Sequence, residues 1–224
     1  MFLKPFQAKS LKPLGHATVV EFVEKNFADP AKIYRVLEIG HGSTGPFSQL
    51  FDDSTRIKRF GIDDNDKDKT VSVDSLNQLR NRYQNTTFYS GYLGDSSSQV
   101  LQFDSFDLVF SVSLIEHIPK GSLMTFHQDL HRILKPGGLQ IHSYDRAWGS
   151  DVKIRKEVID NNGFEWLEKP QKDINDFWSL STIELARTAF EHPYNVMEKF
   201  SHAQPREGRL LYDWVTVITA ARKV

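Results

Sequence analysis

The sequence contains no cysteine. This absence excludes disulfide bonds, catalysis by a thiolate, and zinc or iron–sulfur sites that depend on cysteine ligands. An excess of charge of one sign is also missing, because 28 lysines and arginines nearly balance 29 aspartates and glutamates, giving a formal net charge of −1. A balanced charge gives no general case for nucleic acid or an anionic membrane as the main partner.

Long hydrophobic runs are missing as well. No apolar stretch approaches the roughly 20 residues that span a bilayer, and the basic residues 1–15 lack the continuous apolar core of a signal peptide. We therefore expect a cytoplasmic protein without a membrane segment, and a lightly ordered N-terminal arm over residues 1–15. The 224 residues suffice for one well-packed core and are few for two, so a single domain over 1–224 is predicted.

Short apolar runs alternate with amphipathic patterns along the chain. The strand-like runs lie at 35–39, 58–63, 86–91, 106–113 and 139–144, and the helical patterns at 16–27, 72–85 and 123–134. The segments 195–203 and 211–223 predict two final strands, the latter antiparallel. Together these patterns predict an α/β fold: a doubly wound, mostly parallel seven-stranded sheet with an antiparallel last strand and helices on both faces.

Three glycines follow the first strand-like run in the stretch VLEIGHGSTG, residues 36–45. Glycine is entropically costly to order, so such a cluster marks either a tight turn or a backbone that a ligand approaches closely. Ligands of parallel α/β sheets bind at the carboxyl ends of the strands. The spacing of Gly40, Gly42 and Gly45, with Asp63 closing the second strand, fits a nucleotide-binding turn and an acid that binds ribose.

Glu38 bears on which nucleotide cofactor fits this turn. It precedes Gly40 by two residues and would repel a pyrophosphate packed against the turn. The acid therefore argues against a nicotinamide-dependent oxidoreductase and favours a ligand that carries cationic groups.

In combination, these motifs resemble those of the class I S-adenosylmethionine-dependent methyltransferases, over about residues 35–144. In that family a strand ends in acid-x-Gly-x-Gly (38–42 here), an acid closes the second strand (61–63), and Glu-His (116–117) precedes a helix and Leu-Lys-Pro-Gly-Gly (134–138). The resemblance implies S-adenosylmethionine as cofactor and methyl transfer to a small-molecule O or N acceptor. The alternative is a non-catalytic cofactor-binding protein with the same fold; a nicotinamide-dependent oxidoreductase is less favoured.

The resemblance also implies which residues contact the cofactor. Along its methionine part lie Glu38 and the backbone of Gly40, His41, Gly42 and Gly45; on the ribose hydroxyls Asp63, helped by Asp64; beneath the sulfonium Ser111 and Val112. The chain departs from the family pattern after the third strand, so two adenine contacts stay open. Either Tyr92 stacks on the ring, or Asp95 accepts a hydrogen bond from its amino group.

Two histidines are candidates for a general base. A hydroxyl acceptor benefits from a base whose pKa lies near the working pH, which histidine supplies most readily. His117 follows the fourth strand and His142 lies near the end of the fifth, where the acceptor is expected. The alternatives are that His117 belongs to a Glu-His pair common in the family whatever the acceptor, and that His142 points into a helix layer.

No metal site is predicted. His127 and His131 have the spacing of a helical metal pair, but position 128 is glutamine and no third ligand is evident. The acidic run 63–68 lacks the glycine and the glutamate that a calcium loop needs at its sixth and twelfth positions. Both patterns are interpreted as polar side chains on solvated or partly buried faces.

Residues 146–178 interrupt the strand–helix rhythm and hold three of the four tryptophans. Long insertions in compact domains are usually functional or disordered, and the aromatic residues argue against disorder. The segment is therefore predicted to form a wall or lid of the acceptor pocket. The alternative is that its rings cover a hydrophobic face or a contact in a homodimer.

Overall fold

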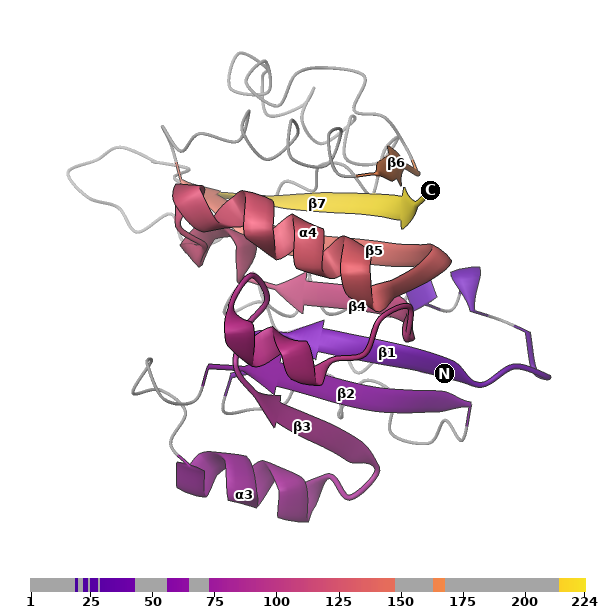
Figure 1. Cartoon of the computed structure of the whole chain (residues 1–224), viewed down its shortest axis with the longest axis vertical. Helices are drawn as coiled ribbons and strands as arrows, with labels where there is room; N and C mark the ends of the chain where they lie inside the picture. The colour runs from indigo at the N-terminus through magenta and orange to yellow at the C-terminus, as the bar shows by residue number, and fades with distance from the viewer. Residues whose placement is uncertain are drawn as a thin grey trace, which may run out of the picture.

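The computed structural model describes residues 19, 22–23, 25–27, 29–42, 56–64, 73–147, 163–167 and 214–224. These residues build a seven-stranded sheet with the order β3-β2-β1-β4-β5-β7-β6, with helices packed against it (Figure 1). The strands are β1 (Tyr34–Ile39), β2 (Ile57–Asp63), β3 (Thr86–Ser90), β4 (Phe106–Val112), β5 (Leu134–Ala147), β6 (Phe164–Trp166) and β7 (Trp214–Lys223). Within these ranges no helix has the length and apolar character to cross a membrane.

The first five strands run parallel, and β7 pairs antiparallel with both β5 and β6. The helical elements are α3 (Val73–Arg82), α4 (Leu123–Ile133) and the 3₁₀ turns η1 (Ser96–Val100), η2 (Ile115–His117) and η3 (Lys120–Ser122). The described residues between 19 and 26 are helical as well. The predicted mostly parallel sheet with an antiparallel last strand is confirmed.

Hydrophobic residues fill both faces of the sheet because successive side chains of a strand point to opposite sides. One cluster combines alternate strand residues, Leu37 and Val109 among them, with apolar side chains of α4. The other combines the neighbouring residues Val36 and Leu108 with the helical residues Val19 and Phe22. Continuous apolar strands of this kind are typical of parallel sheets covered on both faces.

The strand order reverses between β1 and β4. From β1 the chain proceeds to β2 and β3 on one side, then crosses back to place β4 on the other side of β1 (Figure 1). The connections leaving β1 and β4 therefore diverge at their carboxyl ends. Such a switch point is where open α/β sheets bind ligands.

Two strands differ from the prediction. The strand expected at 195–203 lies outside the described residues, and β6 lies instead at Phe164–Trp166, within the segment predicted to be a lid. Phe164 and Trp166 are 6% and 8% exposed and belong to the core on the α4 face. These residues therefore extend the sheet, while a lid formed by other parts of 146–178 stays a prediction.

β5 is longer than the run predicted at 139–144. It begins at Leu134, directly after α4, and pairs there with Phe106 before the register shifts to pair Leu139 with Leu108. Gly137 adopts a positive φ of 74° within this irregular stretch. A positive φ at Gly137 accommodates this irregularity in the pairing of β5 with β4.

Candidate functional site

A cavity of about 420 Å³ lies at the carboxyl ends of β1 and β2. Three parts of the chain line it. The strand ends contribute Ile39, Gly40, Ile62, Asp63 and Asp64; the turn after β3 contributes Tyr92 and Leu93; and the region from the end of β4 to α4 contributes Leu114, His117, Ile118, Pro119, Ser122 and Phe126. Its volume lies in the range of about 300–1,000 Å³ that is common for small-molecule sites.

The glycine turn, residues 40–42, leaves β1 beside this cavity. Gly40 and Gly42 have positive φ values of 71° and 62°, which other L-residues adopt only with strain. A Cβ on Gly40 would lie 2.8 Å from a Leu114 methyl carbon, whereas a Cβ on Gly42 would meet nothing within 4 Å. Conformation therefore favours glycine at both positions, and at Gly40 a side chain would also have to displace the Leu114 methyl groups. Gly45 lies outside the described residues.

Asp63 joins the glycine turn to the end of β2. Its Oδ2 atom accepts a hydrogen bond of 2.6 Å from the backbone N–H of Gly42, and its side chain lines the cavity together with Asp64. The Gly40 N–H donates to the Ile62 carbonyl at 2.9 Å, which holds the same two strand ends together. The acid and the glycines that the sequence predicted to act together are therefore adjacent in space.

His41 lies behind the turn and is not among the residues that line the cavity. It is 2% exposed, its Nδ1 is 2.8 Å from the Gly42 carbonyl oxygen, and its ring packs edge-on against Phe88 with centroids 5.1 Å apart. Burial lowers the pKa of His41, and the nearby charge of Asp63 opposes this shift only in part. The ring is therefore a neutral structural group beside the site.

Three further predicted contacts do not reach the cavity. Glu38 is buried in β1 at 2% exposure, Ser111 is fully buried, and Val112 packs in the core cluster on the face opposite to α4. After β4 the chain turns at Ser113, whose φ is +53°, and it is Leu114 that then lines the cavity. The prediction that Ser111 and Val112 pass beneath the sulfonium assumed that the end of the strand itself faces the ligand.

The turn after β3 distinguishes the two candidates for an adenine contact. Tyr92 lines the cavity. Asp95 instead caps η1, where its carboxylate accepts hydrogen bonds from the Ser97 N–H at 2.9 Å and the Ser96 hydroxyl at 3.2 Å. The Ser97 hydrogen bond is the main cause that lowers the pKa of Asp95. The geometry therefore favours Tyr92.

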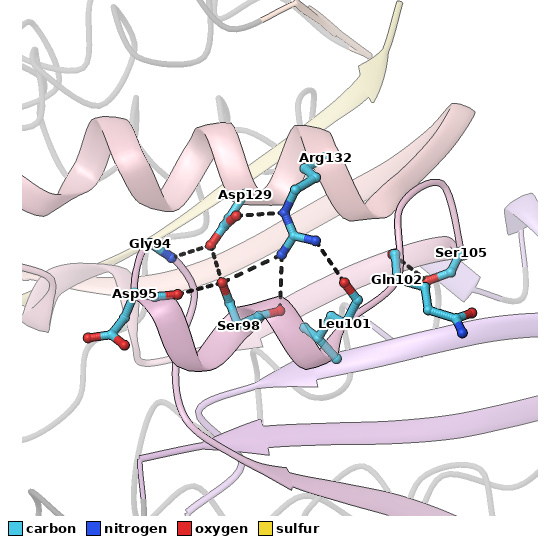
Figure 2. A network of polar contacts seen from close by, with 8 residues as sticks. All are labelled: Gly94, Asp95, Ser98, Leu101, Gln102, Ser105, Asp129 and Arg132. Atoms are coloured by element: carbon cyan, nitrogen blue, oxygen red, sulfur yellow. Dashed lines mark hydrogen bonds and ion pairs between the residues drawn. The ribbon is translucent and has the colours of Figure 1, made fainter.

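A polar network fixes the turn after β3 to helix α4 (Figure 2). The Asp129 carboxylate accepts hydrogen bonds from the Gly94 N–H at 2.7 Å and from Arg132 Nε at 2.8 Å, and the Ser98 hydroxyl lies against it. Arg132 also donates to the Leu101 and Ser98 carbonyls at 2.7 and 3.0 Å. Burial disfavours the charged carboxylate, but these hydrogen bonds outweigh it and lower the pKa of Asp129.

Sequence reasoning missed this network. The feature of the sequence that indicates it is the pair Asp129 and Arg132, three residues apart on one helix. This spacing brings the two side chains together, but it also occurs on many solvated helix faces. The network matters to the site because it anchors the loop that carries Tyr92 and Leu93 into the cavity.

The two candidate bases lie in opposite surroundings. His117 is exposed at the end of η2 and lines the cavity. His142 is 1% exposed, with Nδ1 2.8 Å from the Ser111 hydroxyl oxygen and Nε2 2.9 Å from the Gln140 side-chain carbonyl. Burial, reinforced by His127, lowers the pKa of His142 to about 3. Both ring nitrogens are engaged away from the cavity, so the arrangement does not support His142 as a base.

The two histidines of α4 are not among the residues that line the cavity. His127 is 2% exposed beside Phe126, and His131 packs edge-on against Phe164 with centroids 5.5 Å apart. Among the residues described, no group of three or more potential ligands could hold a metal ion.

Comparison with known proteins identifies the class of the fold. Residues 37–141 match the family model described as a methyltransferase domain. The YcgJ protein of Bacillus subtilis superposes with a TM-score of 0.58 at 15% identity, covering 94% of this chain and 98% of that one. Geranyl diphosphate C-methyltransferase from Streptomyces coelicolor A3(2), crystallised with S-adenosyl-L-homocysteine, superposes with a TM-score of 0.57 at 11% identity, covering 93% and 76%.

The fold also occurs with another named chemistry. The [4+2]-cyclase SpnF superposes with a TM-score of 0.55 at 18% identity, covering 92% of this chain and 80% of that one. No curated protein matches the sequence. The family model covers residues 37–141, fewer than half of the 224, and the superposed structures show that this chain shares their seven-stranded fold.

Proposed function

We propose that the chain transfers the methyl group of S-adenosylmethionine to an oxygen or nitrogen atom of a small-molecule acceptor. The observation that carries this proposal is the composition of the cavity: a glycine turn with positive φ, the carboxylate of Asp63 and an apolar wall share one space of about 420 Å³. In this proposal the cofactor follows the backbone of Gly40, its ribose hydroxyls donate to Asp63 with Asp64 nearby, and its adenine rests against Tyr92.

Different residues of the cavity orient the cofactor and exclude water from it. When bound, S-adenosylmethionine supplies an electrophilic methyl group on a good leaving group, so orientation and exclusion of water carry most of the catalysis. Asp63 fixes the ribose end through charge-assisted hydrogen bonds. Leu114 and Phe126 present apolar surface that keeps water from the reacting atoms.

His117 is the candidate base for a hydroxyl acceptor. It lines the cavity on the wall formed by the residues after β4, and its side chain is open to solvent, so a proton that it accepts can leave. A neutral amine acceptor needs no base during the displacement, so His117 would matter little for transfer to nitrogen. The dependence of the rate on His117 therefore distinguishes the two acceptor types.

The alternative function is binding of the cofactor without methyl transfer. Its support is the similarity to a structure named as a cyclase, which has this fold and a different named reaction. A fold hosts several chemistries, and the acceptor side of the site decides among them.

Calorimetry with S-adenosylmethionine and S-adenosylhomocysteine tests the cofactor, and turnover with hydroxyl and amine acceptors tests the chemistry. We expect both cofactor forms to bind and one acceptor class to yield S-adenosylhomocysteine and a methylated product by mass spectrometry. Binding without any product over a broad acceptor panel would favour the alternative. Failure of both ligands to bind would refute the proposal.

The variant His117→Asn tests the base, with His131→Asn as the matched control outside the cavity. For a hydroxyl acceptor, His117→Asn should lower kcat by about a hundredfold or more, while cofactor affinity stays unchanged. His131→Asn should change neither. An unaltered kcat of His117→Asn with a hydroxyl acceptor would remove the base assignment.

A further inference from the structure

The centre of β2 contains a glycine that no turn explains. Gly61 lies between Phe60 and Ile62 in a buried strand, where glycine weakens the sheet and usually marks a close approach of other atoms. A Cβ on Gly61 would lie 2.9 Å from His41 Cδ2 and 3.0 Å from Phe88 Cδ1. The missing side chain therefore leaves the space that the His41 ring occupies.

The His41 ring, packed against Gly61 and Phe88, is connected to the glycine turn by one hydrogen bond. The Gly42 carbonyl oxygen only accepts, so the contact of 2.8 Å places the proton of the neutral imidazole on His41 Nδ1. Among the residues that the structure describes, none forms a hydrogen bond with the buried Nε2 atom. Leaving a polar atom unpaired has a cost, which indicates that the ring is held here for the contact that its other nitrogen makes.

Gly42 connects this ring to the acid of the site. Its carbonyl accepts from His41 while its N–H donates to Asp63 Oδ2 at 2.6 Å. With φ at +62°, Gly42 has no side chain to restrict it, so its orientation depends on these two hydrogen bonds. A shift of the His41 ring would therefore move Gly42 and change the position of the Asp63 carboxylate.

We propose that His41 is a positioning residue: seated on Gly61 and Phe88, it orients Gly42 and through it the Asp63 carboxylate for the ribose. This inference rests on the proposed function, because it assigns Asp63 to the cofactor. His41 itself does not contact the cofactor in this arrangement, since its side chain lies behind the turn. The predicted contact of the His41 backbone with the methionine part is a separate expectation and is unaffected by this role of the side chain.

A double-mutant cycle tests whether His41 acts through Asp63. The dissociation constant for S-adenosylhomocysteine is measured by calorimetry for the wild type, His41→Phe, Asp63→Asn and the double variant. A phenylalanine at position 41 fills the space beside Phe88 but cannot donate a hydrogen bond to the Gly42 carbonyl. We expect His41→Phe to weaken binding about tenfold in the wild type and not at all in the Asp63→Asn background, because coupled residues are non-additive. Equal losses in both backgrounds would overturn the proposal.

Gly61→Ala provides a second variant that leaves the imidazole intact. Its added methyl displaces the ring from its seat, so binding should again weaken in the wild type and not in Asp63→Asn. Asp107→Asn, which lies outside the cavity, controls for loss of stability alone and should leave the dissociation constant unchanged. Wild-type affinity in both His41→Phe and Gly61→Ala would also overturn the proposal.

The amide resonance of Gly42 separates this inference from the proposed function, because it is read without any ligand. A short hydrogen bond to a carboxylate places that amide proton downfield, and we expect Asp63→Asn and His41→Phe both to move it upfield. If the resonance moves but the wild type binds no S-adenosylhomocysteine, the proposed function fails and the linkage between His41 and Asp63 stands. A resonance unmoved by His41→Phe would refute the linkage.

Discussion

The two ends of the parallel sheet use the same residue type for different purposes. At the amino ends, Asp107 accepts hydrogen bonds from Lys135 Nζ and the Arg35 N–H, each at 2.7 Å, and Lys223 Nζ is 2.7 Å from Asp104. At the carboxyl ends, Asp63 accepts from a backbone N–H and faces a cavity. An aspartate paired with cationic side chains contributes to stability, whereas one that faces a cavity is available to a ligand.

The largest expected effect compares two glycines of nearly equal conformation. Gly40 and Gly137 have φ values of 71° and 74°, but only Gly40 lies against Leu114 at the cavity. Gly40→Val should weaken cofactor binding by about a hundredfold or more, because the side chain is strained and displaces Leu114. Gly137→Val should have a comparable cost in stability and no effect on binding. Titration calorimetry and thermal unfolding of both variants give the comparison.

Equal effects of the two glycine variants on affinity would break the distinction between the ends of the sheet. Backbone strain would then lower cofactor affinity by destabilising the whole fold and not by altering the site.

Replacing Asp63 or Asp107 by alanine tests the same distinction between the two ends of the sheet by removing a charge at each. Asp63→Ala should weaken cofactor binding by about 10- to 100-fold, the loss of a charge-assisted hydrogen bond, with little change in unfolding free energy. Asp107→Ala should lower the unfolding free energy by about 1–2 kcal/mol and leave binding unchanged. Urea unfolding and calorimetry on the two variants should therefore give opposite patterns, and identical patterns would contradict the assignment of Asp63.

His142 sharpens the comparison, because it lies near the carboxyl ends yet does not reach the cavity. Its folded pKa of about 3 lies below the ordinary value of 6.5, so the unfolded chain binds the proton first as pH falls. The neutral ring's contribution is complete above pH 6.5 and is lost as pH falls from 6.5 towards 3. By pH 5 this amounts to about 2 kcal/mol.

Urea unfolding at pH 7.5 and pH 5 measures this loss, with His142→Gln as the comparison. The variant should lose less stability than the wild type over the same interval, because it removes the group that is protonated only on unfolding. A wild type and variant with the same pH dependence would show that the ring is not held neutral.

The smallest expected effect concerns the two candidates for the adenine contact. Tyr92→Ala should weaken binding severalfold, on the scale of about 1 kcal/mol for a lost aromatic contact. Asp95→Ala should destabilise the cap of η1 and leave binding nearly unchanged, since its carboxylate bonds to Ser96 and Ser97. A larger loss in Asp95→Ala would reverse the choice between them.

The mostly parallel sheet, and the edge at which the glycines and the acid meet, follow from patterns that are local in sequence. Apolar runs of strand length, glycines directly behind the first run and an acid at the end of the second predicted a parallel sheet with Gly40, Gly42 and Asp63 at one edge. These residues are near neighbours of strand ends, and parallel strands bring their carboxyl ends together whatever the details of packing. The same reasoning could not place β6, because three residues in an aromatic segment carry no distinctive period.

Only the tertiary structure decided what each side chain near that edge faces. Sequence alone ranked His117 and His142 together, and packing separated them, because one follows a turn into solvent and the other points between a sheet and a helix. It assigned Ser111 to the ligand; in the structure Ser111 is buried, and after the turn at Ser113 it is Leu114 that lines the cavity. Residue types and spacings determine which elements form and where they end; the direction of a side chain, its burial and therefore its pKa depend on contacts between residues far apart in the chain.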